Sequence, residues 1–158
     1  MEALEAHAET LSCLGTAQGF PQYLNSGVLY RGCVLARRGR LREGLALYMQ
    51  GLNATRAAGK EREVPLASAL LAEAYRKAGQ AAEGLAVLEE PLGRVARTGE
   101  GWMEAELHRV KGELLTALPQ WDPGKVEDCF HRSIAVARLQ SAKMWELRAA
   151  RSLARLWG

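Results

Sequence analysis

The strongest constraint on the fold of this chain is an internal repeat with a period of 40 residues. The segment 43–46, Glu-Gly-Leu-Ala, returns unchanged at 83–86. Small residues recur in the same register, in the series Gly19, Gly59 and Gly99, the pair Gly39 and Gly79, and the series Gly32, Ala72 and Gly112. A period between about 20 and 50 residues indicates stacked units of two elements rather than one central core. A stack of this kind offers a long surface, and we expect the function to lie there.

Each repeat has the apolar spacing of helices. Ala67, Leu71 and Ala74 fall on one helical stripe, and a similar stripe runs from Leu107 to Leu118. β-branched residues are scarce and no stretch alternates with a period of two, so we expect an all-α fold. Glycines mark the turns and the helix ends. The expected helices cover residues 2–17, 22–38, 41–56, 65–78, 81–97, 102–118, 123–140 and 143–157.

Glycines also occur within the expected helices, where each costs about 1 kcal/mol relative to alanine. These are Gly32, Gly44, Gly84 and Gly112. A larger side chain at such a position would collide with a neighbouring helix. We therefore interpret these glycines as points where helix backbones approach closely.

The expected helices form one domain of 158 residues, which is long enough to bury a core. An unpaired helix, 2–17, precedes three helical pairs at about 22–56, 65–97 and 102–140, and a second unpaired helix, 143–157, follows them. The third pair has a longer turn, 119–123. It adds two residues, so Val126 matches Gly84 at an offset of 42 rather than 40.

The residues at these positions resemble the tetratricopeptide repeat, a two-helix unit with small residues where the helices cross. Gly32, Gly44, Tyr48 and Leu52 match one unit, and the equivalent residues of the next two pairs match two more. The resemblance implies a right-handed superhelical solenoid. The first helix of each pair would line a concave groove.

Longer strings resemble one group of tetratricopeptide proteins more closely. They are residues 18–21, 70–75, 102–109, 111–115 and 148–157. The group is the C-terminal helical region of large bacterial regulators that join a nucleotide-cyclase-like or DNA-binding output domain to a signalling ATPase domain. No GxxxxGK[ST] phosphate-binding loop occurs in this sequence, so the chemistry of those domains is not expected here.

The resemblance also implies which residues would face a partner in the groove. They are Ser26, Leu29, Cys33, Arg37, Leu66, Ala69, Glu73, Arg76, Lys77, Glu106, Arg109, Glu113, Thr116, Arg148, Arg151 and Arg155. Helical spacing supports the last three, which lie at i, i+3 and i+7 on one face.

Two interpretations of the charged part of this set stay open. The arginines of the last helix have no matching acids beside them on their own face, and guanidinium groups suit the capture of carboxylates. In the other interpretation, Glu106, Arg109 and Glu113 pair within their own helix and with neighbouring arginines. They would then form a solvated face in which each pair contributes only tenths of a kcal/mol.

No arrangement of residues indicates an enzyme, a metal site or a cofactor. Glu104 and His108 share a helix face, but zinc needs a third protein ligand and the spacing offers none, so an ordinary Glu–His pair is favoured. Tryptophans crowd the last third of the chain, and we interpret them as packing residues at helix starts and turns. No nucleophile and base are placed together by spacing.

Composition bounds the location and the partners. Hydrophobic residues make up 48% and charged residues 25%, as in a folded soluble domain. The acidic N-terminus has no signal-peptide pattern, and no apolar run could span a membrane. Three cysteines without a CxxC pair, Cys13, Cys33 and Cys129, suggest buried thiols in a cytoplasmic protein.

The sequence suggests three candidate functions. The first is a scaffold that binds a peptide or a partner domain in the groove. The second is a sensor that binds a small effector there. The third is a nucleic-acid binder, against which the net charge of only +3 and the interleaved glutamates argue.

An open end would also allow self-association. The last helix lacks a pair partner, so its apolar residues are expected to be poorly covered: Trp145, Leu147, Leu153, Leu156 and Trp157. The first helix, with Leu4, Ala8, Leu11 and Leu14, is expected to be the complementary unpaired half. Joining one end to the other would propagate without closing, so we expect a two-fold homodimer.

Overall fold

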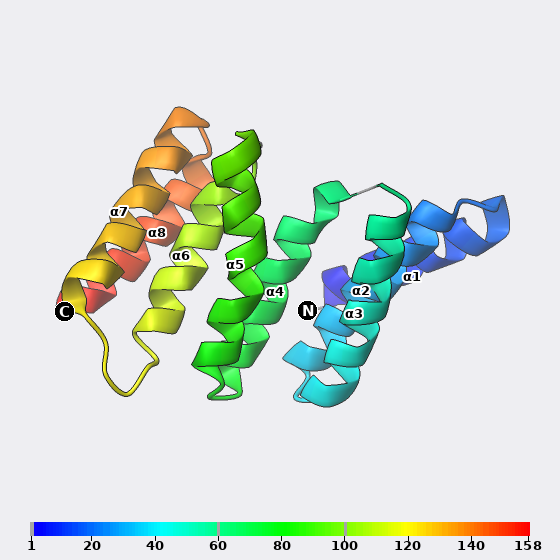
Figure 1. Ribbon diagram of the computed structural model, residues 1–158, viewed down its shortest axis with the longest axis horizontal. Coiled ribbons are helices and arrows are strands. Elements are labelled where there is room, and N and C mark those ends of the chain that lie inside the picture. Colours follow the sequence, from blue (N-terminus) through cyan, green and yellow to red (C-terminus); the bar gives the residue numbers. More distant parts are fainter. Residues whose placement is uncertain (1, 60, 100) are drawn as a thin grey trace.

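The computed structural model describes residues 2–59, 61–99 and 101–158, and these residues form eight α-helices and one short 3-10 turn (Figure 1). The helices are α1 Glu2–Gln18, α2 Pro21–Arg37, α3 Leu41–Ala57, α4 Val64–Lys77, α5 Ala81–Thr98, α6 Glu104–Leu115, α7 Pro123–Leu139 and α8 Lys143–Trp157, with the turn η1 at Glu61–Glu63. No described residue belongs to a β-strand. The expected all-α class is therefore confirmed.

The helix ends agree with the sequence-based expectation within one residue, except in the sixth helix. That helix was expected over 102–118, but α6 runs only from Glu104 to Leu115. Residues on both sides of α6 adopt turns instead. The apolar stripe that suggested a longer helix therefore continues into the turns.

The turns between helices rely on the left-handed backbone region, which glycine adopts most readily. Gly39 and Gly79, with φ of 85° and 74°, lie in the turns within the first two pairs. Gly19, Gly59 and Gly99, with φ between 64° and 71°, follow the ends of α1, α3 and α5. After α7 the same place, offset by 42 residues, is taken by Ser141 at φ 54°. Ser141 is the one described non-glycine residue with a positive φ.

Replacing this serine should stabilise the protein. A left-handed backbone costs a non-glycine residue about 1–2 kcal/mol, part of which the greater freedom of glycine in the unfolded chain offsets. We expect Ser141→Gly to raise the free energy of unfolding by about 0.5–1 kcal/mol. The reverse change at the equivalent position, Gly99→Ser, should lower it. Urea denaturation measures both, and an unchanged or lower stability for Ser141→Gly would contradict the assignment.

The helices are arranged in two rows (Figure 1). The even-numbered helices α2, α4, α6 and α8 pack against one another in sequence order. The odd-numbered helices α3, α5 and α7 pack mainly against the even-numbered helices next to them in the chain, and in Figure 1 they lie in front. Helix α1 packs along α2. The even-numbered row is thus a continuous face built from four segments.

Helices α2 and α3 touch backbone to backbone because glycines occupy both sides of the contact. A Cβ atom added to Gly44 would lie 2.5 Å from the amide nitrogen of Ala36, and one added to Gly32 would lie 2.5 Å from that of Tyr48. At Gly84 and Gly112 the nearest atoms belong to side chains instead, Leu114 at 2.6 Å and Phe130 at 2.6 Å. The expected close approach of backbones is therefore found at Gly32 and Gly44, whereas a side chain occupies the space beside Gly84 and Gly112.

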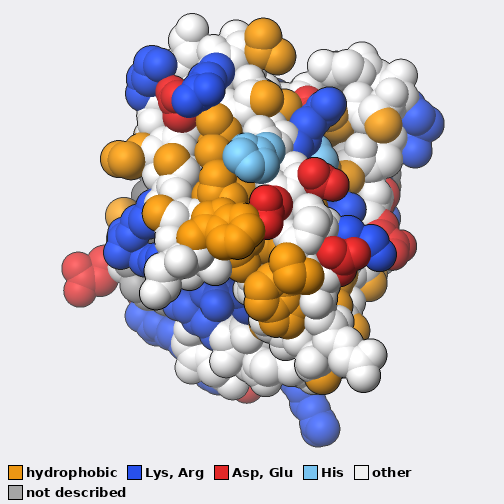
Figure 2. All heavy atoms as spheres, turned by 90° about the vertical axis from the view of Figure 1, so that its left-hand side faces the viewer, with side chains coloured by type: hydrophobic (Ala, Val, Ile, Leu, Met, Phe, Trp, Pro, Cys, Tyr) orange, Lys and Arg blue, Asp and Glu red, His pale blue; other side chains and the backbone are white. Residues whose placement is uncertain are grey.

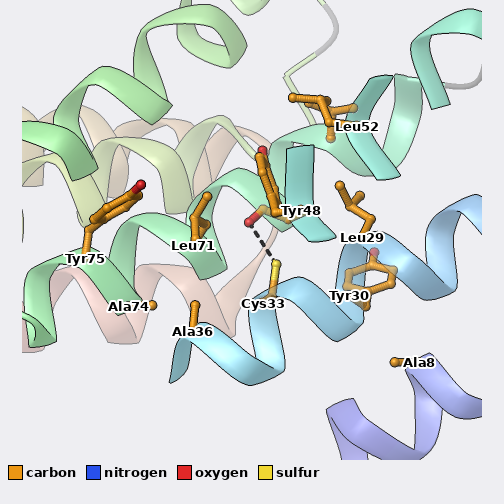
Figure 3. Close-up of a cluster of buried hydrophobic side chains, with 12 residues drawn as sticks. Ala8, Leu29, Tyr30, Cys33, Ala36, Tyr48, Leu52, Leu71, Ala74 and Tyr75 are labelled. Atoms are coloured by element: carbon orange, nitrogen blue, oxygen red, sulfur yellow. Dashed lines mark hydrogen bonds between the residues drawn. The ribbon is translucent and has the colours of Figure 1, made fainter. Parts of the chain in front are cut away.

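The core is divided along the stack. One cluster of buried side chains lies among α1, α2, α3 and α4 (Figure 3), a second among α4, α5 and α6, and a third where α6 and α7 meet the start of α8. In the first cluster, Tyr48 and Ser68 share a hydrogen bond of 2.8 Å between their hydroxyl groups. Each cluster therefore joins the two helices of a pair to a helix of a neighbouring pair.

Candidate binding face

A buried arginine lies at the centre of the even-numbered row. The side chain of Arg109, on α6, is only 4% exposed. Its Nε and Nη2 donate to Glu106 at 2.9 Å, its Nη1 donates to Glu113 at 2.6 Å, and its Nη2 also donates to Glu73 on α4 at 2.6 Å. Three carboxylates thus surround one guanidinium.

Further arginines extend this group to α2 and α8. Arg148 on α8 contacts Glu106 at 2.8 Å and Glu73 at 3.4 Å. Arg37 on α2 lies 3.6 Å from Glu73, and Arg76 on α4 lies 3.5 Å from Glu113. The hydroxyl of Ser152 on α8 donates to Glu113 at 2.8 Å. We call the seven charged residues Arg37, Glu73, Arg76, Glu106, Arg109, Glu113 and Arg148 the charge cluster.

The pKa values of Arg109 and Glu113 both shift in the direction that favours the charged form. Burial acts to lower the pKa of Arg109, but the hydrogen bond and charge of Glu106, with the charges of Glu113 and Glu73, outweigh it and raise that pKa. Burial acts to raise the pKa of Glu113, but the charge of Arg109 and the hydrogen bond from Ser152 lower it overall. The ion pair between Arg109 and Glu113 therefore persists at neutral pH.

These contacts show how the charged residues of both interpretations are paired. Glu106, Arg109 and Glu113 do pair within α6 and with arginines of neighbouring helices. Glu106 and Arg109 are buried, however, and Glu73 and Glu113 are half-buried, whereas the sequence suggested a solvated face. Arg148 is paired and not free. Arg151 and Arg155 are exposed, and neither forms an ion pair with another residue that the structure describes.

Two of the residues expected to form the apolar part of the groove do not line it. Leu29 and Cys33 are fully buried, so neither can face a partner. Leu29 packs against α3, where Gly51 admits it: a Cβ at Gly51 would lie 2.6 Å from the Leu29 nitrogen. The Cys33 thiol donates to the carbonyl of Ala67 at 3.4 Å, the dashed line in Figure 3, and burial raises its pKa to about 12.

Other expected residues are divided between surface and core. Lys77 is exposed at the end of α4, outside the two pockets described below, and Ser26 is buried. The expectation that all three cysteines are buried is wrong for Cys13, which is exposed on α1. The buried cysteines are Cys33 and Cys129, and all three are free thiols.

Two pockets open on the even-numbered row, on either side of Arg109. The first, of about 400 Å³, has tryptophan and methionine side chains beside one part of the charge cluster, and we call it the Trp pocket. Its lining is Arg37, Leu66, Ala69, Leu70, Glu73, Trp102, Met103, Glu106, Met144, Trp145 and Arg148. The second, of about 330 Å³, is lined by Arg76, Glu113, Thr116, Trp121, Phe130, Ser152, Arg155 and Leu156. Ten of the sixteen expected groove residues line one pocket or the other.

The aromatic residues of the Trp pocket were not expected there, because tryptophans at helix starts are usually packing residues. Trp102 is 40% exposed, and its indole Nε1 donates to the carbonyl of Arg62 at 3.2 Å. Trp145 packs against two core clusters. The sequence held a signal for the pair, since Trp102-Met103 and Met144-Trp145 are separated by the 42-residue offset.

A larger hollow of about 510 Å³ lies elsewhere, lined by Arg62, Pro65, Pro91, Arg94 and Trp102 among others. Arg94 and Glu61, which both line it, form an ion pair with each other. It contains none of the charge cluster, and it shares Trp102 with the Trp pocket.

Glu104 and His108 behave as an ordinary pair. The His108 Nε2 lies 3.7 Å from the Glu104 carboxylate, which also accepts a hydrogen bond from Arg132 at 2.9 Å. Burial lowers the pKa of His108. Within residues 2–59, 61–99 and 101–158, no group of three or more His, Cys, Asp or Glu residues is placed to hold a metal ion.

The C-terminal end of the stack exposes apolar side chains. Leu147 is 71% exposed and Trp157 is 68% exposed, while Trp145, Leu153 and Leu156 are partly buried. Met144 and Leu139, which the sequence did not single out, are exposed as well. Figure 2 looks onto this end and shows hydrophobic side chains gathered in the middle of the face.

The N-terminal end differs from the expectation of an unpaired apolar half. Ala8 is buried, and Leu4 and Leu11 pack against the same core cluster as α2. Leu14 is 44% exposed, and most other exposed residues of α1 are polar or small. The two ends of the stack are therefore not complementary.

Comparison with protein-family models gives no match, and comparisons with curated proteins and with solved structures give none either. None of the described helices combines the length and the apolar character that crossing a bilayer requires.

Proposed function

We propose that this chain is a tetratricopeptide-like, right-handed superhelical solenoid that acts as a non-enzymatic scaffold. It binds an extended peptide or a segment of a partner domain along the face of α2, α4, α6 and α8. The observation that carries the proposal is the pair of pockets that flank Arg109 on one row of helices. Consecutive packing along that row, looser packing among the odd-numbered helices and glycines at the helix crossings support the solenoid.

The resemblance in sequence extends the proposal to the setting of the chain. The strings at 102–109 and 148–157 favour a module that is part of, or derived from, a cytoplasmic bacterial signalling regulator. In that setting the scaffold would couple a partner to an output domain. Nucleic acid is a poorer candidate, because glutamates alternate with the arginines of the face.

A small-effector sensor is the second candidate, and the Trp pocket favours it. Sites for small molecules commonly have volumes of about 300–1,000 Å³, and this pocket combines apolar walls with a few charged groups. A ligand that binds only the folded state raises the melting temperature. Thermal-shift screening against metabolites separates the two candidates, since a hit that depends on Trp102 favours the sensor.

The scaffold proposal predicts where a peptide binds. Met144 lines the Trp pocket and is 66% exposed, whereas Met49 is 44% exposed on α3, outside both pockets. For a peptide selected from a random library on the native chain, we expect Met144→Glu to weaken binding at least about tenfold, and the matched Met49→Glu to change it less than about twofold. Calorimetry measures both. Equal effects would move the site off this face.

We also propose that the exposed end at α8 mediates self-association. Leu147 and Trp157 form an apolar surface that the polar outer side of α1 cannot match, so a two-fold pairing of like ends is favoured over a filament. Sedimentation at micromolar concentration should show a dimer, and Leu147→Lys should return it to monomer. A monomer for the unmodified chain would refute this pairing.

A further inference from the structure

We propose that the segment bound in the Trp pocket carries a large apolar side chain next to a single carboxylate. This inference rests on the proposed function and adds the chemistry of the partner. It follows from the charge balance of the cluster, from unused hydrogen-bond donors at the pocket edge and from the apolar walls.

The charge cluster has a surplus of positive charge. It contains the four arginines Arg37, Arg76, Arg109 and Arg148 and the three glutamates Glu73, Glu106 and Glu113, so its formal charge is +4 − 3 = +1. Arg155, which lines the second pocket, adds another positive charge, and Arg151 is exposed on the same helix. An approaching anion would balance this surplus, because a partly buried charge is poorly solvated.

Two arginines at the Trp pocket have donors to spare. Arg37 reaches Glu73 only at 3.6 Å, which is too long for a hydrogen bond. Its Nε has no hydrogen-bond partner among the described residues, and its side chain is 23% exposed. The side chain of Arg148 is 43% exposed, with Nη1 2.8 Å from Glu106 and Nη2 donating to Glu73 at 3.4 Å. A guanidinium has five N–H donors, and a carboxylate can accept from two of them at once.

The same pocket has apolar side chains that are exposed to solvent. Trp102 and Met144 are exposed by 40% and 66%, and Leu66 and Leu70 lie between them and the core. The hydrogen bond from the Trp102 indole to Arg62 holds the ring in place. A rigid aromatic wall suits an aromatic or branched aliphatic side chain.

The flanking glutamates limit the anion to one charge. Glu73 and Glu106 line the pocket together with the arginines, so a second negative charge on the ligand would lie close to two carboxylates. Like charges at such distances disfavour binding. A carboxylate is therefore preferred over a phosphate group.

Matched dipeptides test the proposal on the full chain. The probes are N-acetyl-Phe-Glu-amide, its Gln counterpart, its phosphoserine counterpart and N-acetyl-Ala-Glu-amide. The binding signal is the fluorescence of Trp102 and Trp145 in the variant Trp121→Phe/Trp157→Phe, which retains only these two of the four tryptophans. We expect the Phe-Glu probe to bind at least about fivefold more tightly than each of the other three, and its affinity to fall with added salt.

Arginine variants locate the carboxylate. Arg37→Gln and Arg148→Gln should each remove most of the preference for Glu over Gln, whereas the matched Arg132→Gln, on the exposed side of α7, should leave it unchanged. The ratio of two affinities is insensitive to a modest loss of stability, and either arginine variant serves if the other fails to fold. Equal binding of the Glu and Gln probes, tighter binding of the phosphoserine probe, or absence of any fluorescence change at millimolar probe would overturn the proposal.

The inference on the bound segment and the proposed scaffold function can fail independently of each other. If library-selected peptides bind this face but show no enrichment of acidic residues beside apolar ones, the scaffold stands and the inference on its partner fails. If the dipeptide binds as expected and no longer peptide does, the scaffold fails and the pocket belongs to a small ligand.

Discussion

Gly44→Leu is expected to destabilise the protein by more than about 3 kcal/mol, because no side chain can be accommodated between α2 and α3. The atoms nearest to a Cβ at Gly44 are the backbone nitrogen of Ala36 at 2.5 Å and the backbone oxygen of Gly32 at 2.6 Å. Neither can move without separating the helices. Urea denaturation measures the loss, and Gly44→Ala provides a smaller change should the leucine variant not fold.

A glycine elsewhere in the same type of helix serves as the control. A Cβ at Gly93 in α5 would meet only the flexible end of Arg97, at 3.3 Å. Gly93→Ala should therefore stabilise the protein by up to about 1 kcal/mol through helix propensity alone. Similar effects of Gly44→Ala and Gly93→Ala would show that the helix faces are wrongly assigned.

Arg109→Met is expected to destabilise the protein by about 3–5 kcal/mol, the range found when one partner of a buried ion pair is removed. The change leaves Glu73, Glu106 and Glu113 close together without the guanidinium that all three contact. Arg109→Lys keeps the charge but loses the planar fork, so it should cost less. Denaturation of both variants measures the difference.

Acid should reduce the difference between Arg109→Met and the unmodified protein. The folded-state pKa of Glu113 lies below its ordinary value of 4.5, so its contribution to stability is present above that value and is lost as the pH falls through the folded pKa. In Arg109→Met, protonation removes the repulsion among the carboxylates of Glu73, Glu106 and Glu113, so acid lowers the stability of this variant less than that of the unmodified protein. The control Arg132→Met, at an exposed pair with Glu104, should cost less than about 1 kcal/mol. A similar loss for both variants would mean that the charge cluster adds no stability.

Much of the fold could be predicted because its determinants are local. A residue with a positive φ follows α1, α3 and α5 at intervals of 40 residues. Ser141, which takes this place after α7, also has a positive φ although it is not a glycine. The glycines at helix crossings were predictable because a mid-helix glycine has a cost that only close packing offsets. The reason for each close approach was not predictable, since backbone limits Gly44 and a side chain limits Gly84.

The residues that share the candidate site could be predicted from the sequence, but the depth at which they are buried could not. The tetratricopeptide resemblance placed Glu73, Glu106 and Arg148 in one groove, and they do line one pocket. Whether a charged residue is solvated depends on its neighbours in space, so the enclosure of Arg109 by three helices could not be read from one helix. Leu29 lies in the register of Arg109, yet it packs against Gly51 of α3 and has no access to the face.

The most direct test of the binding face is a methyl NMR titration, because some methionines lie in the Trp pocket and another lies away from it. Met103 and Met144 line the Trp pocket, whereas Met49 lies on α3 outside both pockets. With methionine labelled at its ¹³C methyl group, a library-selected peptide should shift the signals of Met103 and Met144 and leave that of Met49 unchanged. A shift of Met49 alone, or binding that leaves Met103 and Met144 unmoved, would contradict the account.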